Sequence, residues 1–289
     1  MDVREKQVNE EKSSSRLSDT PHARETILSR FRQLCAVDSR VEAAFVGGSL
    51  ATGTADQFSD LDIYLITSDA VYDAFFTERK EFVHRLGDPV YLEDFDGFGF
   101  DMVLFILANG VWGELGLGKA SHFLHIHGGP YRVLVDKTGI LKDIHFPLYR
   151  PSAEAQRDRL KTAYGTFWRH ILLFVKAMGR NRLLTASSYF DIARKQLLLV
   201  CRLSIDFQAT KGMPVEELLP QALLEAYSKT FFPLNRTAML NSVKKATQLF
   251  PQVAKPLARV WGIDYPEQLE IVVMNYVNEL NGADPSSNC

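Results

Sequence analysis

The sequence predicts an α/β (α+β) fold, in which an N-terminal domain with a mixed sheet is followed by a C-terminal helical bundle. Short runs rich in β-branched and aromatic residues recur between Arg40 and Asp136, as is typical of strands. The strand patterns fade near Pro147–Ser152, and beyond this point apolar residues recur at helical spacing. We therefore expect a polar arm over residues 1–21, one domain over residues 22–150 and a second over residues 151–289.

The N-terminal elements follow one another as an arm, a helix, two strands and a second helix. Residues 1–21 are charged and Ser-rich, so they offer too little apolar surface to favour an ordered structure. Apolar residues at helical spacing predict a helix over residues 22–36. Alternating apolar residues predict strands over residues 40–46 and 60–66, and helical periodicity returns over residues 69–86.

Three further strands are predicted before the domain boundary. Residues 89–93 and 99–106 carry strand patterns, and residues 94–97 between them have the composition of a turn. Residues 132–136 form the last predicted strand. These strands complete the mixed sheet of the first domain.

The Gly-rich segment Gly113–Lys119 fits the first seven positions of a P-loop. Ala120 stands where a P-loop has the Ser or Thr that binds Mg²⁺. We expect a flexible loop over the active-site cleft, and a true P-loop is the alternative.

The second domain is predicted to be helical throughout. One long helix spans residues 154–180, and a capping-box-like Ser188-x-x-Asp191 predicts the start of a second helix that reaches Phe207. Prolines separate three further helical stretches. The residues of the long helix that we expect to face inward are Leu160, Tyr164, Phe167, Ile171, Phe174 and Met178, and the separating prolines are Pro214, Pro233, Pro251 and Pro266.

Two carboxylates and a glycine turn form the candidate active site. Asp60 and Asp62 alternate along a strand, so both face the same side and suit a shared hard cation such as Mg²⁺. Gly47 and Gly48 allow the chain to turn closely around an anion, and Ser49 adds a hydroxyl for a phosphate oxygen. Together these features indicate nucleotidyl transfer from a nucleoside triphosphate (NTP).

The motif Gly48-Ser49, ten residues, Asp60-Leu61-Asp62 resembles the signature of the DNA polymerase beta nucleotidyltransferase superfamily, which includes the lincosamide and aminoglycoside nucleotidyltransferases. Residues 39–64 most resemble the lincosamide group. The resemblance implies that Asp60 and Asp62 are catalytic and bind two Mg²⁺ ions. It also implies transfer of a nucleoside monophosphate, with ATP as the expected donor, to a hydroxyl of a small antibiotic.

The same resemblance implies a third carboxylate on a neighbouring strand. Asp101 has apolar neighbours and is assigned this role, either as a metal ligand or as the general base. Asp94 and Asp96 compete for it, but they adjoin Gly97 in a predicted turn, where Asp is common for other reasons.

Positive charge for the triphosphate is expected from the long helix. Lys176 and Arg180 lie four residues apart on one helical face and are predicted to bind nucleotide. Arg182 and Arg194 are alternatives. His122, His125 and His127 are expected at a polar loop edge rather than in a metal site, and His170 is expected to be packed in the helix.

Charge, cysteine spacing and hydropathy exclude several classes of protein. The formal net charge is −2 and the sequence pI is about 6.4, which disfavours a long nucleic acid partner. The three cysteines lack disulfide or zinc spacing, and no segment has the length and apolarity of a membrane span, so a cytoplasmic protein is expected. Homodimerisation stays open. An RNA- or metabolite-modifying nucleotidyltransferase and a non-catalytic nucleotide sensor are the alternative functions.

Overall fold

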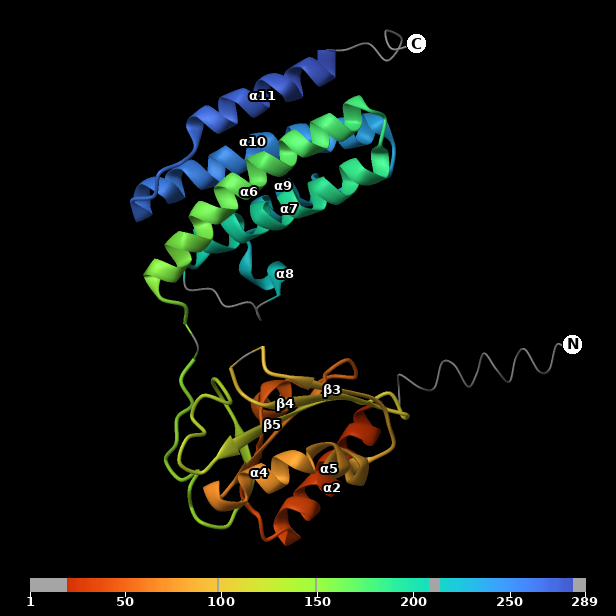
Figure 1. Ribbon diagram of the computed structural model, residues 1–289, viewed down its shortest axis with the longest axis vertical. Helices are drawn as coiled ribbons and strands as arrows, with labels where there is room; N and C mark the ends of the chain where they lie inside the picture. Colours follow the sequence, from red (N-terminus) through yellow and green to blue (C-terminus); the bar gives the residue numbers. More distant parts are fainter. Residues whose placement is uncertain (1–19, 98, 149, 208–213, 283–289) are drawn as a thin grey trace, which may run out of the picture. The chain divides into compact units, whose positions relative to one another are not determined.

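The computed structural model describes residues 20–97, 99–148, 150–207 and 214–282. The chain divides into two compact units, Met1–Leu148 and Tyr149–Cys289 (Figure 1). The predicted polar arm lies outside the described residues, except that Thr20 and Pro21 are the first residues of a helix.

The first unit is built on a six-stranded mixed sheet with the strand order β3-β4-β5-β2-β1-β6. The strands are β1 (Val41–Val46), β2 (Leu61–Thr67), β3 (Pro89–Phe95), β4 (Met102–Leu107), β5 (Trp112–Lys119) and β6 (Arg132–Asp136). All the predicted strands are confirmed, and only β2 and β5 pair in parallel. The turn predicted at residues 94–97 begins later, because Asp94 and Phe95 continue β3.

The prediction of a flexible loop or P-loop over Gly113–Lys119 is wrong, because this segment lies in β5, between β4 and β2. Its glycines make room for large neighbouring rings. A Cβ on Gly116 would lie 2.5 Å from Cδ1 of Tyr64, and a Cβ on Gly113 would lie 2.3 Å from Cζ of Phe105. Glycine in a strand often marks such a close approach, so the composition reflects packing rather than loop flexibility.

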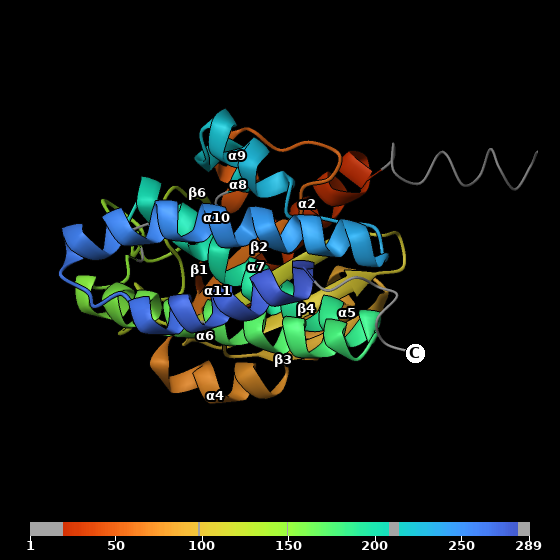
Figure 2. The same ribbon diagram turned by 90° about the horizontal axis from the view of Figure 1, so that it is seen from above.

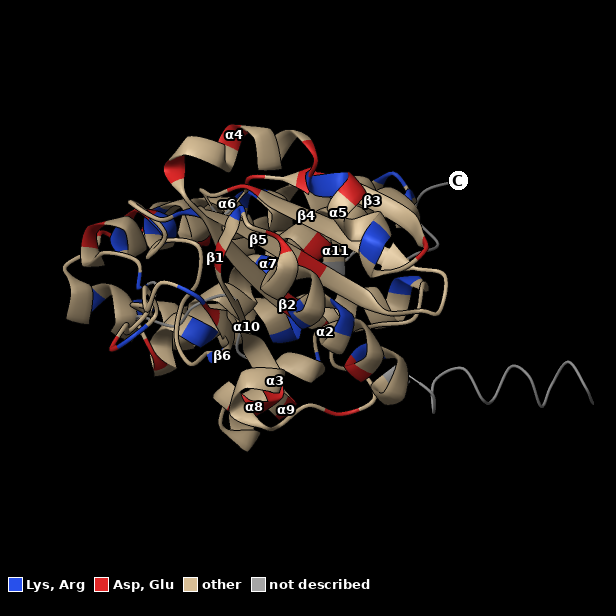
Figure 3. Ribbon diagram, turned by 90° about the horizontal axis from the view of Figure 1, so that it is seen from below, with Lys and Arg blue, Asp and Glu red and all other residues tan. Residues whose placement is uncertain are grey.

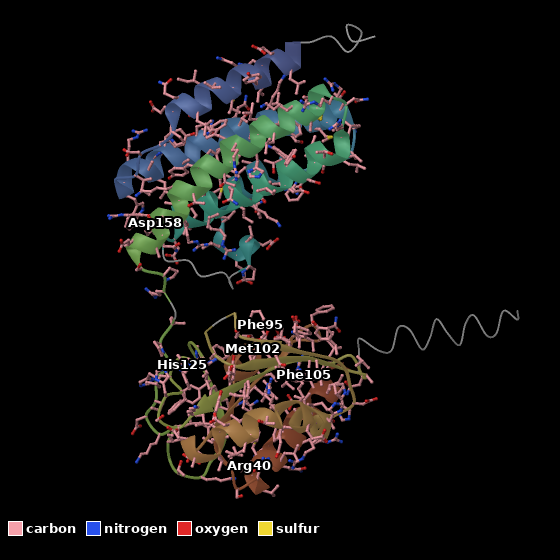
Figure 4. All side chains as sticks on the ribbon, in the orientation of Figure 1. Arg40, Phe95, Met102, Phe105, His125 and Asp158 are labelled. Carbon is pink, nitrogen blue, oxygen red and sulfur yellow. The ribbon has the colours of Figure 1, made fainter. Side chains whose placement is uncertain are left out.

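Helices cover one face of the sheet, as Figure 1 shows for α2 (Thr20–Val37), α4 (Asp69–Thr77) and α5 (Arg79–Leu86). The single helix predicted over residues 69–86 is instead two, and Glu78 separates them. The break lets α4 pack on β2 and β5 while α5 packs on β3 and β4. Successive side chains of β4 point to opposite faces of the sheet. Phe105 packs in the core between the sheet and these helices, whereas Met102 does not belong to that core (Figure 4).

The opposite face of the sheet carries a smaller core on β1 and β2. The segment that follows β5 packs here against the aromatic rings of both strands. The buried members of this core are Ala43, Phe45, Tyr64, Ile66, Phe123, Ile126, Leu141 and Phe146. The candidate site lies on this same face, where β2 begins beside β5.

The second unit consists of helices around one continuous hydrophobic core. Figure 2 shows the long helices running alongside one another. The helices are α6 (Ala153–Gly179), α7 (Leu183–Ile205), α8 (Val215–Leu218), α9 (Gln221–Ser228), α10 (Arg236–Trp261) and α11 (Glu267–Gly282). All the residues of α6 that were predicted to face inward are buried, which confirms that prediction.

Two helix boundaries differ from the predictions. Ser188 does not cap a helix but lies inside α7, where its hydroxyl donates to the carbonyl of Leu184 at 3.2 Å. Pro251 does not end a helix, because it lies within α10 together with Pro256. The apolar face of α10 is buried along its whole length, so packing outweighs the hydrogen bonds lost at the two prolines.

Neither unit carries a membrane-spanning segment in its described part: each helix there is too short or too polar to cross a bilayer. Along the ribbon of each unit, Lys and Arg positions alternate with Asp and Glu positions (Figure 3).

Candidate active site

Three carboxylates gather on the open face of the sheet. Asp62 is the second residue of β2, and its register partner on the parallel strand β5 is Glu114. Register partners on adjacent strands point to the same face, about 4.8 Å apart at the backbone. Asp60 immediately precedes β2, and its negative charge acts on both Asp62 and Glu114. The structure therefore places an unpredicted third acid, Glu114, beside the predicted pair.

Repulsion and burial make this cluster costly to ionise. Burial, followed by the charges of Asp60 and Glu114, raises the pKa of Asp62 to about 7. Burial and the charge of Asp60 also raise the pKa of Glu114. None of the three carboxylates forms an ion pair with a Lys or Arg of the described residues. A bound cation would therefore relieve the repulsion.

The donor set fits Mg²⁺. Carboxylate oxygens are hard ligands, and Mg²⁺ is commonly held by one or two carboxylates, with water and substrate phosphates completing its shell. No complete cluster of three metal-binding side chains occurs among the residues that the structure describes. A site of this kind would therefore depend on the substrate for its remaining ligands, and Asp60 and Asp62 would be its protein ligands.

The glycine turn lies directly against Asp62. The N–H of Gly47 donates to the carbonyl of Asp62 at 2.9 Å, so it is not free to bind a phosphate. Gly48 adopts a left-handed conformation with φ of 54°. A Cβ on Gly48 would lie only 2.0 Å from Oδ2 of Asp62. Glycine is therefore required at position 48 by both the backbone and the neighbouring carboxylate.

Ser49 offers the predicted hydroxyl at this turn. It lies in the first turn of the short helix α3 (Gly48–Thr52), where backbone N–H groups have no partner within the helix. Its Oγ is buried and has no hydrogen-bond partner in the described part of the chain. A buried hydroxyl without a partner is costly, so a phosphate oxygen at this position would be stabilising.

The His127 ring packs against the glycine turn at Gly47, whereas the sequence predicted it at a polar loop edge. Its Nε2 lies 3.0 Å from the carbonyl oxygen of Pro130, and its ring lies 4.8 Å from that of Tyr64. A Cβ on Gly47 would lie 2.6 Å from the His127 Cε1. Burial lowers the pKa of His127, so a neutral imidazole fills the space under the glycine turn.

His122 and His125 lie on the exposed connection after β5, as predicted. Figure 4 labels His125. Their rings stack with centroids 4.4 Å apart. His170 is buried in α6, where its Nδ1 lies 2.7 Å from the carbonyl oxygen of Thr166, so it is a packed histidine as predicted.

Asp101 lies elsewhere on the first unit. It precedes β4 and accepts a hydrogen bond from the Tyr72 hydroxyl at 2.7 Å. Its carbonyl accepts from the N–H of Leu117, three residues beyond Glu114 on β5. At about 3.3 Å per residue, Asp101 is displaced by roughly 10 Å along the sheet from Glu114. Glu114, rather than Asp101, is therefore the acid that lies beside Asp62, and the catalytic role predicted for Asp101 stays a prediction.

The basic residues predicted to bind nucleotide belong to the second unit. Lys176 is in the last turn of α6 and Arg180 caps its C-terminus, and both are exposed. Of the alternatives, Arg182 precedes α7 and is exposed, whereas Arg194 pairs with Asp191. The nucleotide-binding role of these residues stays a prediction.

Substitution of Gly48 by Ala is expected to inactivate the site. The added Cβ would displace the Asp62 carboxylate, and the left-handed backbone would cost about 1–2 kcal/mol. We expect kcat to fall by at least about tenfold, which is a barrier increase of about 1.4 kcal/mol. Melting temperature and steady-state kinetics measure the two effects separately.

Gly53→Ala is the matched control for Gly48→Ala. Gly53 is also left-handed, with φ of 75°, but a Cβ there would meet nothing within 4 Å. It should therefore show a similar loss of stability with nearly unchanged kcat. Equal loss of activity in both variants would mean that backbone strain, rather than the contact with Asp62, explains the effect.

The raised pKa of Asp62 predicts a pH-dependent stability. Between about pH 4 and pH 7 the folded chain retains a proton that the unfolded chain has lost, so this group lowers stability as the pH rises through that range. Without metal, the melting temperature of Asp62→Asn minus that of the wild type should be larger at pH 8 than at pH 5, by at least about 2 °C. Mg²⁺ at pH 8 should stabilise the wild type more than the variant. A gap that does not change with pH would contradict the electrostatic assignment.

Comparisons with known proteins bear on this site. A family model described as streptomycin adenylyltransferase matches residues 22–280. No protein with a curated function matches the sequence.

Two solved structures are similar at low identity. An aminoglycoside 6-adenyltransferase from Bacillus subtilis is 18% identical with a TM-score of 0.44, over 90% of this chain and 97% of that protein. A nucleotidyltransferase-like protein from Exiguobacterium sibiricum is 14% identical with a TM-score of 0.37, over 82% of this chain and 79% of that one.

Proposed function

Because the chain belongs to the streptomycin adenylyltransferase family, we propose that it transfers an adenylyl group from ATP to a hydroxyl group of an aminoglycoside. The family match spans most of the chain and makes the protein a nucleotidyltransferase. The observation that carries the proposed reaction is the contact of the Gly48 turn with Asp62, next to Glu114 on β5. A phosphate bound at this turn would lie against the carboxylates, which supports the proposal.

Each residue has a distinct role in the proposed reaction. Asp60 and Asp62 would hold Mg²⁺, which when bound neutralises charge on the triphosphate and the leaving pyrophosphate. Backbone N–H groups at Gly48 and Ser49, with the Ser49 hydroxyl, would orient the phosphates. Lys176 and Arg180 remain candidates for further phosphate contacts.

Glu114 is proposed as the general base. The acceptor hydroxyl oxygen forms a bond to the α-phosphorus of ATP, the bond from that phosphorus to pyrophosphate breaks, and the hydroxyl proton passes to the carboxylate of Glu114. The raised pKa of Glu114 favours this transfer, because a base is most effective when its pKa approaches the working pH. Tyr64 follows Asp62 by two residues on β2, and burial and the charges of the three acids raise the pKa of its hydroxyl, so it keeps its proton.

The choice of acceptor rests on the family rather than on the local motif. The sequence around Gly48 and Asp62 resembles lincosamide enzymes, whereas the family description names streptomycin, which favours an aminoglycoside. The presence of Asp60, Asp62 and a third acid disfavours a non-catalytic sensor, and the formal net charge of −2 disfavours RNA. The buried free thiols of Cys35 and Cys201 suit a reducing cytoplasm.

Pyrophosphate release tests the proposal. Purified protein is given Mg²⁺ with ATP or GTP and, separately, streptomycin, a second aminoglycoside, a lincosamide and a short RNA, with Asp62→Asn as the blank. We expect release with ATP and an aminoglycoside, none in the blank, and a mass increase of one adenylyl group on the acceptor. Release with only the lincosamide or only the RNA would overturn the proposed acceptor, and no release with any acceptor would overturn the proposed activity.

A further inference from the structure

The sheet face that carries the acidic cluster continues beyond it as two ordered rows of side chains. In the first row, Asp62 on β2 pairs with Glu114 on β5, Glu114 pairs with Leu104 on β4, and Leu104 pairs with Glu93 on β3. Since register partners share a face, this row leads from the proposed catalytic acids to a further carboxylate at the sheet edge.

The second row lies beside the first and is aromatic and apolar. Trp112 on β5 pairs with Ile106 on β4, which pairs with Tyr91 on β3. Trp112 and Tyr91 each lie two residues from an acid of the first row, Glu114 and Glu93 respectively, so they share its face. The Tyr91 hydroxyl donates a hydrogen bond to Oε2 of Glu93, which ties the two rows together at the edge.

These side chains are accessible, unlike their neighbours on the other face. Tyr91 is 43% exposed and Trp112 is 36% exposed, and Glu93 is exposed as well. By contrast, Val103 and Leu115, which alternate with these rows, are fully buried in the core beneath the helices. Exposed aromatic rings beside carboxylates are a common feature of ligand-binding surfaces.

The surface has the chemistry and size for a cationic sugar. Aromatic rings attract cations over their faces and offer flat apolar area, and a carboxylate accepts strong hydrogen bonds from an ammonium group. Three strand spacings separate Asp62 from Glu93, which is roughly 14 Å at about 4.8 Å each. A molecule of two or three rings would span this distance, with one end at Glu114.

We propose that Trp112, Tyr91 and Glu93 form the acceptor subsite, in which the two rings lie against sugar rings and Glu93 binds an amino group of the acceptor. This inference rests on the proposed function. In the proposed reaction Asp60 and Asp62 hold the metal and Glu114 takes the proton, so Glu93 is the further acid of the first row that can select a positively charged acceptor. A neutral sugar would bind the same rings without the contribution of Glu93.

Four variants test the subsite. Trp112→Ala and Glu93→Gln should each raise KM for streptomycin by about tenfold or more, equivalent to about 1.4 kcal/mol of binding, with KM for ATP changed less than about twofold. Trp112→Phe should retain most of the affinity, because it keeps an aromatic face. Glu81→Gln, an exposed residue of α5 on the helical side of the sheet, is the matched control and should behave as wild type.

Calorimetric titration of streptomycin separates failure of the subsite from failure of the function, because binding needs no turnover. The wild type and each variant are titrated without nucleotide and with Mg²⁺ and a non-hydrolysable ATP analogue, after melting temperatures confirm folding. Weaker binding in Trp112→Ala and Glu93→Gln alone supports the subsite even if pyrophosphate release fails. Absence of streptomycin binding to the wild type in both conditions would overturn it. So would binding and KM values in these variants equal to those of Glu81→Gln, in which case the proposed transfer would still stand.

Discussion

Asp62→Asn is expected to abolish nucleotidyl transfer while leaving the chain folded and at least as stable. Asn keeps the shape of the side chain but cannot supply the negative charge that a metal ion needs. Loss of this ligand should reduce kcat by at least about a thousandfold, or roughly 4 kcal/mol of transition-state stabilisation. Stability should be maintained, because the substitution removes a carboxylate that is repelled by Asp60 and Glu114.

Asp73→Asn is the control for this substitution. Asp73 lies on α4, its side chain is 93% exposed, and it forms an ion pair with Lys119 at 3.7 Å. Exposed pairs of this kind contribute little, so kcat and melting temperature should stay near the wild-type values. Pyrophosphate release by Asp62→Asn at a rate near that of wild type would exclude Asp62 as a metal ligand. Unfolding of Asp62→Asn would show that the Asp62 carboxylate is needed for the stability of the fold.

The strands and long helices could be predicted because their local patterns agree with their final packing. β1 and β2 are rich in apolar, β-branched and aromatic residues, and α6 places its large residues at helical spacing, so burial follows from the pattern. The family match likewise confirms the resemblance drawn from Gly48-Ser49 and Asp60-Leu61-Asp62.

β5 could not be predicted because its sequence is determined by its neighbours. Gly116 is small where the Tyr64 ring of a distant segment lies, and Gly113 is small where the Phe105 ring lies across the β4–β5 pair, so both contacts depend on strand pairing rather than on local sequence. Local composition therefore indicated a loop. The missed strand also concealed Glu114, since an acid in a loop has no defined face, whereas in β5 it must lie beside Asp62.

Some helix boundaries were predicted wrongly for a related reason. Tertiary packing decided where α4 ends and α5 begins, and it kept α10 continuous through two prolines. Sequence rules for caps and breaks describe local preferences, and burial of a long apolar face outweighs them. The place of His127 was missed in the same way, because its ring packs against Gly47, Phe45 and Tyr64, which are distant in sequence.

Glu114→Gln and Asp101→Asn together decide which third carboxylate acts. Gln cannot take a proton at neutral pH, so Glu114→Gln should lower kcat by about 10²–10⁴-fold, the usual contribution of a general base. The rise of kcat with pH should also be lost, while KM for ATP changes little. Asp101→Asn should cost less than about tenfold, because the amide oxygen of Asn can still accept the hydrogen bond from Tyr72.

The decisive result is which of the two variants, Glu114→Gln or Asp101→Asn, loses more kcat. A larger loss in Asp101→Asn, with Glu114→Gln nearly active, would return the role to the residue indicated by the sequence motif and would require the first unit to bring Asp101 toward Asp62 during turnover. Equal and severe losses would mean that both acids act. Since Glu114 is the register partner of Asp62 and Asp101 lies roughly 10 Å further along the sheet, we expect the loss to fall on Glu114.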